Sequence, residues 1–180
     1  MLESTAALLE RAGRPELLRA RRRNGERVTV DGAEVHVRDQ APLHRGNVDL
    51  PPGWGFEDLV ELLNRQVFFW PGDERGPIGY GQRHFETYAA EAPVILRAPF
   101  RSIVDANPDN PPRFCRFNSG SPRRVGGRAS PRGPETFQTA GACDYPPGEV
   151  VEVTFENRAF LPPDTLFARS LDGPWEQLSG

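Results

Sequence analysis

Residues 55–72, GFEDLVELLNRQVFFWPG, hold the pattern of a helix that runs directly into the pattern of a strand. Four apolar residues of the first half share one helix face at i, i+3, i+4 and i+7 spacing: Phe56, Leu59, Val60 and Leu63. We therefore expect an amphipathic helix over Gly55–Arg65. Residues 67–70, Val-Phe-Phe-Trp, then predict a short aromatic strand, which Pro71 and Gly72 end.

Toward the N-terminus, the sequence predicts two helices and a hairpin. Ser4 or Thr5 can cap a first helix that runs through Ala12, and a second helix is expected over Glu16–Asn24. Alternating residues on both sides of Asp31-Gly32 predict a β-hairpin, because this dipeptide suits a tight two-residue turn.

Beyond the aromatic strand, the sequence predicts a helix over Gln82–Glu91 and several further strands. The uninterrupted apolar run Val94-Ile95-Leu96 is typical of a central strand, and residues 114–117 predict another. The alternating run 149–155 predicts a strand with one apolar face, and Asp172-Gly173 predicts a closing hairpin. With helices early and strands late, we expect one α+β domain over residues 1–180.

All 22 basic residues are arginine, because the 180-residue chain contains no lysine. This excludes Schiff-base chemistry and phosphate-binding loops that depend on a lysine. The two cysteines and three histidines share no metal-ligand spacing, so we expect no metal site. The net charge of −3 predicts no general attraction to nucleic acid or membranes. Since no apolar run approaches the roughly 18 residues of a spanning helix, we expect a cytoplasmic protein without a membrane partner.

Residues 118–134, NSGSPRRVGGRASPRGP, form the least regular stretch of the chain. From Arg113 to Arg132 there are six arginines and no acid. Glycine-rich backbone can approach a phosphate closely, and guanidinium groups bind phosphate with forked hydrogen bonds. The candidate substrate-binding residues are therefore Asn118, Ser119, Arg123, Arg124, Arg128 and Arg132. The alternative is a solvated basic loop that holds no ligand.

Glu135 follows this loop and precedes an apolar stretch that begins at Thr136-Phe137. A carboxylate held at a strand edge beside a bound phosphate ester can stabilise a developing oxocarbenium ion or act as a base. Glu135 is therefore the candidate catalytic residue. The alternative is an ion pair between Glu135 and Arg132.

The aromatic residues have structural and functional interpretations. Because side chains alternate along a strand, we expect Phe68 in the core, while Phe69 or Trp70 can face a ligand. Tyr80 and His84 are one helical turn apart and can either pack together or stack on a nicotinamide ring or a base. Cys115 is expected to be a small buried apolar residue.

Much of the chain resembles an uncharacterised bacterial family of unknown function, over roughly residues 1–138. Four stretches carry this resemblance: VRDQAPL at 37–43, LNRQVFFWPG at 63–72, FCRFNSGSPR at 114–123 and SPRGPETF at 130–137.

The order of features also resembles the DarT-type ADP-ribosyltransferases, which modify bases in single-stranded DNA. The resemblance implies an ADP-ribosyltransferase-like split β-sheet core with N-terminal helices, and NAD as the substrate that donates the ADP-ribosyl group. It places Arg38 on NAD, Phe69 and Trp70 along the nicotinamide pocket, and Glu135 in catalysis; Tyr80 is a further candidate for stacking on the cofactor. These side chains should then border one pocket, with Glu135 open to it.

A binding module without catalysis is the alternative. The chain opens with Met1-Leu2-Glu3-Ser4-Thr5 and lacks, ahead of it, the histidine-bearing strand that the resemblance leads us to expect. On this hypothesis, the arginines of 118–134 hold single-stranded nucleic acid or an acidic partner.

Overall fold

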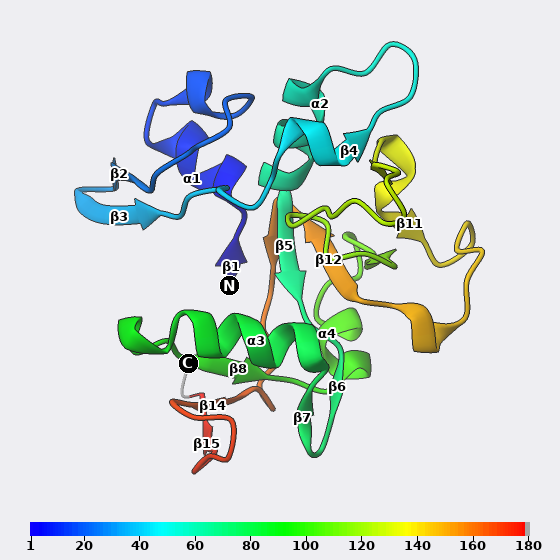
Figure 1. Cartoon of the computed structure of the whole chain (residues 1–180). Helices are drawn as coiled ribbons and strands as arrows, with labels where there is room; N and C mark the ends of the chain where they lie inside the picture. Colours follow the sequence, from blue (N-terminus) through cyan, green and yellow to red (C-terminus); the bar gives the residue numbers. More distant parts are fainter. Residues whose placement is uncertain (179–180) are drawn as a thin grey trace.

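The computed structural model describes residues 1–178, and a four-stranded antiparallel sheet lies at its centre (Figure 1). The four α-helices of the described chain are α1 (Thr5–Arg11), α2 (Phe56–Asn64), α3 (Gly79–Thr87) and α4 (Phe100–Asp105). The strands up to β8 are β1 (Leu2–Glu3), β2 (Glu26–Val30), β3 (Ala33–Val37), β4 (Val48–Asp49), β5 (Gln66–Phe69), β6 (Gly72–Asp73), β7 (Gly76–Pro77) and β8 (Ile95–Arg97). The later strands are β9 (Arg113–Cys115), β10 (Ser130–Pro131), β11 (Gln138–Thr139), β12 (Glu152–Glu156), β13 (Arg158–Ala159), β14 (Leu166–Ala168) and β15 (Glu176–Gln177).

The central sheet has the strand order β11-β9-β12-β5, and five smaller sheets surround it. In one of these smaller sheets, β10 pairs with β4 in parallel. Another smaller sheet has three antiparallel strands, β8, β14 and β15. The architecture is mixed α and β, as expected, but helices and strands alternate along the chain instead of helices preceding strands.

Strand register decides which residues share each face of the central sheet. Glu152 lies opposite Cys115, and Thr154 lies opposite both Phe68 and Arg113. Because side chains alternate along a strand, these residues share one face, and the other face carries Val67, Phe69, Phe114, Val153 and Phe155.

Both faces of the sheet are covered. On the Cys115 face, Phe137 packs with Leu59, Val60 and Leu63 of α2. On the other face, the strand residues pack against Ile103 of α4 and Leu2 of β1. The predicted apolar face of the strand at 149–155 carries the buried Val153 and Phe155, and the opposite face is buried as well, since every residue of β12 except Glu156 is buried.

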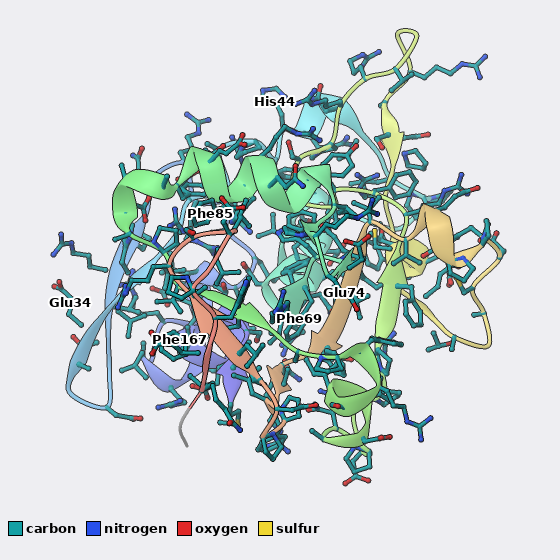
Figure 2. The ribbon with its side chains drawn as sticks, turned by 90° about the horizontal axis from the view of Figure 1, so that it is seen from below. Glu34, His44, Phe69, Glu74, Phe85 and Phe167 are labelled. Atoms are coloured by element: carbon teal, nitrogen blue, oxygen red, sulfur yellow. The ribbon has the colours of Figure 1, made fainter. Side chains whose placement is uncertain are left out.

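The aromatic strand has the opposite orientation to the one expected. Phe69, labelled in Figure 2, is partly buried and packs edge-on against the buried Phe155 with ring centroids 5.7 Å apart. Phe68 is 40% exposed and contacts Phe137 on the other face. The sequence fixes the alternation of side chains but not the face that tertiary contacts bury.

Local sequence signals produce the expected N-terminal elements. Ser4 caps α1 by accepting a hydrogen bond from the Ala7 N–H. Asp31 and Gly32 have φ angles of 49° and 81°, which close the β2–β3 hairpin. The first helix, the hairpin, the helix at 56–64 and the closing β14–β15 hairpin are confirmed.

The predicted helix over Glu16–Asn24 is wrong, because only Pro15–Leu17 form a short 3-10 turn. Long-range contacts hold the rest of the segment. Arg22 is 5% exposed and donates to the Arg38 carbonyl and to Asn64 Oδ1. Gln40 also donates to Asn64 Oδ1, so residues from two of the quoted motifs meet at one buried arginine.

Three other elements differ from expectation. The apolar run at 94–96 belongs to an edge strand, since β8 pairs with β14 alone. Helix α3 begins and ends earlier than predicted, and α4 forms where no helix was expected.

Helix α3 lies across the end of β5 and contacts Trp70 (Figure 1). Gly81 is buried there: a Cβ added at this position would lie 2.8 Å from Pro77 Cβ and 2.9 Å from Trp70 Cγ. The close approach of the helix to Trp70 therefore requires glycine at position 81.

We predict that Gly81→Ala lowers the free energy of unfolding by about 1–2 kcal/mol, because overpacking outweighs the gain in helix propensity. Gly79→Ala is the matched control, since its added Cβ would meet only Arg83 Nη1 at 3.5 Å. Urea unfolding of both variants checks the prediction. Equal or higher stability of Gly81→Ala would contradict the observed packing.

Candidate functional site

Residues 118–134, here called the arginine loop, run as irregular chain away from the central sheet. The loop tip is a turn in which Val125 and Arg128 exchange backbone hydrogen bonds. Two contacts hold the tip against the segment before β4: Asn47 Nδ2 donates to the Pro122 carbonyl at 3.0 Å, and Arg124 Nη1 donates to the Gly46 carbonyl at 2.9 Å. Figure 2 shows this loop projecting beyond the edge of the molecule on which His44 lies.

Arg132 closes the base of the arginine loop from inside. Its guanidinium donates to the carbonyls of Asn118 and Ser119, where the loop leaves the sheet. It also donates to Ser130 Oγ at 2.7 Å and to the Pro131 carbonyl at 2.8 Å, where the loop returns. The side chain is 4% exposed, and its guanidinium carbon lies 4.3 Å from the centroid of the Phe117 ring.

Glu152 lies beneath the same loop and is 3% exposed. Its Oε1 accepts a hydrogen bond from the Ser119 N–H at 3.1 Å, whereas its Oε2 has no partner within the described chain. Burial raises the pKa of the Glu152 carboxyl to about 7, although Ser119 and the Arg132 charge oppose this shift. An ionised Glu152 is therefore costly in this position.

Further polar atoms near Glu152 lack partners. Among residues 1–178, the buried hydroxyls without a hydrogen bond are Ser119 Oγ, Thr154 Oγ1 and Tyr145 OH. Thr154 shares the sheet face of Glu152, and burial raises the pKa of both Tyr145 and Cys115, whose thiol reaches a pKa of about 12. These polar side chains therefore lie out of contact with solvent beneath the loop.

Sequence reasoning did not identify Glu152. In the alternating run at 149–155, Glu152 lies on the strand face opposite Val151, Val153 and Phe155, where an acid normally faces water. Only the loop that folds over that face buries it, and no local pattern gives that information. The accompanying prediction for Cys115, a buried thiol, is confirmed.

The exposed part of the loop carries the positive charge. Arg123, Arg124 and Arg128 are exposed, as are His44 and Arg45 on the adjoining segment. Within residues 1–178, none of these side chains takes part in an ion pair. Arg123, Arg124 and Arg128 form the arginine surface referred to below, while Ser119 and Arg132 support it and Asn118 is half-buried.

Glu135 lies on a 3-10 turn, Pro134–Thr136, and its side chain is exposed. The predicted strand after it does not begin until β11, because Phe137 turns into the core against Phe68. The alternative of an ion pair with Arg132 is not formed, since Arg132 donates to the loop backbone.

The residues predicted to hold NAD form a separate cluster. Trp70 stacks on Tyr80 with centroids 6.3 Å apart and also contacts His84, which in turn contacts Tyr88. Arg38 lies 3.8 Å above the Tyr88 ring and forms an ion pair with Glu91. Partial burial and the Arg38 charge lower the pKa of His84. Phe69 is partly buried against the core on the other face of its strand.

The structure brings Arg38, Trp70 and Tyr80 into one cluster but leaves Glu135 outside it. Among residues 1–178, no hydrogen bond, ion pair or ring contact joins Glu135 to these side chains. The role of Glu135 in catalysis and of the cluster in NAD binding stay predictions.

Two hollows adjoin one another along α2. The larger, about 330 Å³, is lined by Trp54, Asp58, Glu61, Leu62 and Arg65 together with Gly53. The smaller, about 180 Å³, shares Leu62 and Arg65 and extends to Phe137, Pro134, Gln66, Arg113 and Glu156. Each acid here has an arginine partner: Asp58 and Glu61 pair with Arg19, and Glu156 pairs with Arg113.

The Family of unknown function (DUF7002) matches residues 1–161, and the chain belongs to this family. No curated protein and no solved structure matches the chain. Across residues 1–178, no helix has the length and apolar character needed to cross a membrane, and no three metal-binding side chains gather.

We predict that the protein loses stability as the pH rises from about 4.5 to about 7. Glu152 has a pKa of about 7 in the folded chain against an ordinary value of 4.5, so the folded state holds its proton more tightly. The stabilisation is complete below about pH 4.5 and is lost by about pH 7, with an upper bound of roughly 3 kcal/mol.

Urea unfolding at several pH values, on the wild type and on Glu152→Gln, measures this contribution. The variant cannot ionise at this position, so the difference between its stability and that of the wild type should increase with pH. Parallel pH profiles for the two proteins would contradict the assignment.

Proposed function

We propose that this protein binds nucleic acid by placing backbone phosphates on the arginine surface. The observation that carries the proposal is a group of exposed arginines that form no ion pair within residues 1–178, on a loop whose base is closed by a buried guanidinium. A planar guanidinium binds phosphate with forked hydrogen bonds, and a loop that is already ordered pays less entropy on binding.

The net charge of −3 does not oppose this function, because the loop segment itself carries arginines and no acid. The chain from Arg113 to Arg132 contains no acid, and many other arginines are neutralised by neighbouring carboxylates, such as Arg75 by Asp73 and Arg101 by Asp105. Local positive charge is what a polyanion meets on approach.

Single-stranded nucleic acid is the form that we favour. The hollows along α2 have aromatic and apolar walls from Trp54, Leu62 and Phe137, and their charges are paired. Unstacked bases are uncharged and suit such walls, whereas the bases of a duplex are not available for stacking. The rim of the hollows is connected to the arginine loop, because β10 of the loop pairs with β4 and Gly133 lies against Pro51.

A second proposal is NAD binding at the Arg38 cluster, within an ADP-ribosyltransferase-like core. It is supported by the meeting of Arg38 with Trp70 and Tyr80 through a chain of rings. Glu91 forms an ion pair with the Arg38 guanidinium, so NAD phosphates have to displace the Glu91 carboxylate. Glu91→Gln should therefore strengthen NAD binding. Transfer of radiolabel from NAD to single-stranded DNA, abolished in Glu135→Gln, is the test of catalysis.

We predict that the double variant Arg123→Ala/Arg128→Ala binds a single-stranded oligonucleotide of about 15 nucleotides at least about tenfold more weakly than the wild type at low salt. If each arginine contacts one phosphate, the slope of log affinity against log salt should become shallower by about 1.4. Fluorescence anisotropy over a salt series measures both quantities.

The matched control is Arg75→Ala/Arg101→Ala, which removes the same charge from exposed, ion-paired positions. The control should bind within about threefold of the wild type, because changes outside the contact area act only through screened charge. Equal losses in the two double variants would show that binding follows total charge and would overturn the proposal.

A further inference from the structure

The Glu152 carboxyl group holds the base of the arginine loop, and it can be either protonated or ionised. Glu152 Oε1 accepts the Ser119 N–H, which is the point where the loop leaves the sheet. Its Oε2 is sealed from water and has no partner within residues 1–178. When the loop is closed, the carboxyl is therefore cut off from water on one side and hydrogen-bonded to the loop on the other.

The groups that face Glu152 come from the loop, from β9 and from the segment after β11. Among residues 1–178, Arg132 is the charged group that acts on it, and Cys115 lies directly opposite it in the sheet. The Tyr145 hydroxyl lies near Cys115. The Arg132 donors go to the loop backbone and not to Glu152, so the ionised carboxyl has no salt bridge to offset its burial.

We infer that Glu152 is the positioning residue of the arginine loop, and that the proton it takes from solvent holds the loop closed on the sheet. The inference rests on the proposed function insofar as the closed loop is the form that presents the arginine surface to phosphates. Glu152 does not touch the ligand and acts through Ser119 and the loop backbone.

The direction of the effect follows from proton linkage. Opening the loop exposes the carboxyl to water, which returns its pKa toward the ordinary value near 4.5, whereas closure raises the pKa to about 7. The closed form therefore holds the proton more tightly and loses its advantage as the pH rises. Between about pH 6 and about pH 8, the equilibrium constant for closure falls about tenfold.

Amide hydrogen exchange tests loop closure without any ligand. The reporters are the Ser119 N–H, bonded to Glu152, and the Arg132 N–H, bonded to the Asp49 carbonyl. In the wild type, their protection factors, corrected for intrinsic exchange, should fall about tenfold from about pH 6 to about pH 8 and stay below those of the β12 amides. In Glu152→Gln the fall should disappear.

Oligonucleotide affinity over the same pH range, at constant salt, is the second readout. The wild type should lose affinity by up to about tenfold, because only the closed fraction binds. His44 is an exposed histidine that adjoins the arginine surface, so His44→Gln is the control and should keep most of the loss.

The two proposals fail in different ways. If the wild type shows no pH dependence of Ser119 and Arg132 protection, or if Glu152→Gln keeps it, the positioning role is overturned whatever binds the loop. If the protection behaves as expected and no oligonucleotide binds at any pH, the proposed function fails and the loop closure stands. A pH effect on affinity that vanishes in His44→Gln overturns the link between Glu152 and binding.

Discussion

The structure depends on one buried guanidinium. Arg132 donates to carbonyls at both ends of a seventeen-residue loop, residues 118–134, that has little regular secondary structure. Without that fork, the carbonyls of Asn118, Ser119 and Pro131 would lose the hydrogen bonds that Arg132 donates to them. Lysine cannot replace this geometry, since an ammonium group lacks the planar fork. The loop is thus ordered by a side chain that takes no part in the exposed surface.

Each neighbouring element has a role in this arrangement. The central sheet supplies a flat polar face with Glu152 and Thr154, α2 and Phe137 build the core beside it, and β4 pairs with the returning end of the loop. Within residues 1–178, the side chains of Asn47 and Arg124 hold the tip against the segment before β4. The exposed arginines are thus presented by a loop that is anchored at its base and at its tip.

Local patterns in the sequence predicted the elements that local physics decides. Ser4 capped its helix, Asp31-Gly32 closed its hairpin and the apolar stripe of residues 56–63 formed α2, because caps, turns and amphipathic faces depend on neighbours in the chain. The arginine-rich loop was located for the same reason. Where contacts come from far along the chain, the predictions were wrong. Arg22 is not in a helix, because its guanidinium hydrogen-bonds to Asn64. Phe68 and Phe69 each lie on the face that was expected for the other. Glu152 could not be found because its burial comes from a loop about twenty residues earlier in the sequence.

The central claim is that Arg132 orders the arginine loop from below. Hydrogen exchange of Arg132→Lys tests it most directly, because lysine keeps the charge and removes the fork. In this variant we expect the Val125 and Arg128 amides, each of which donates to the other residue's carbonyl at the tip, to lose protection while the amides of β12 keep theirs. Unchanged protection at Val125 and Arg128 in this variant would contradict it.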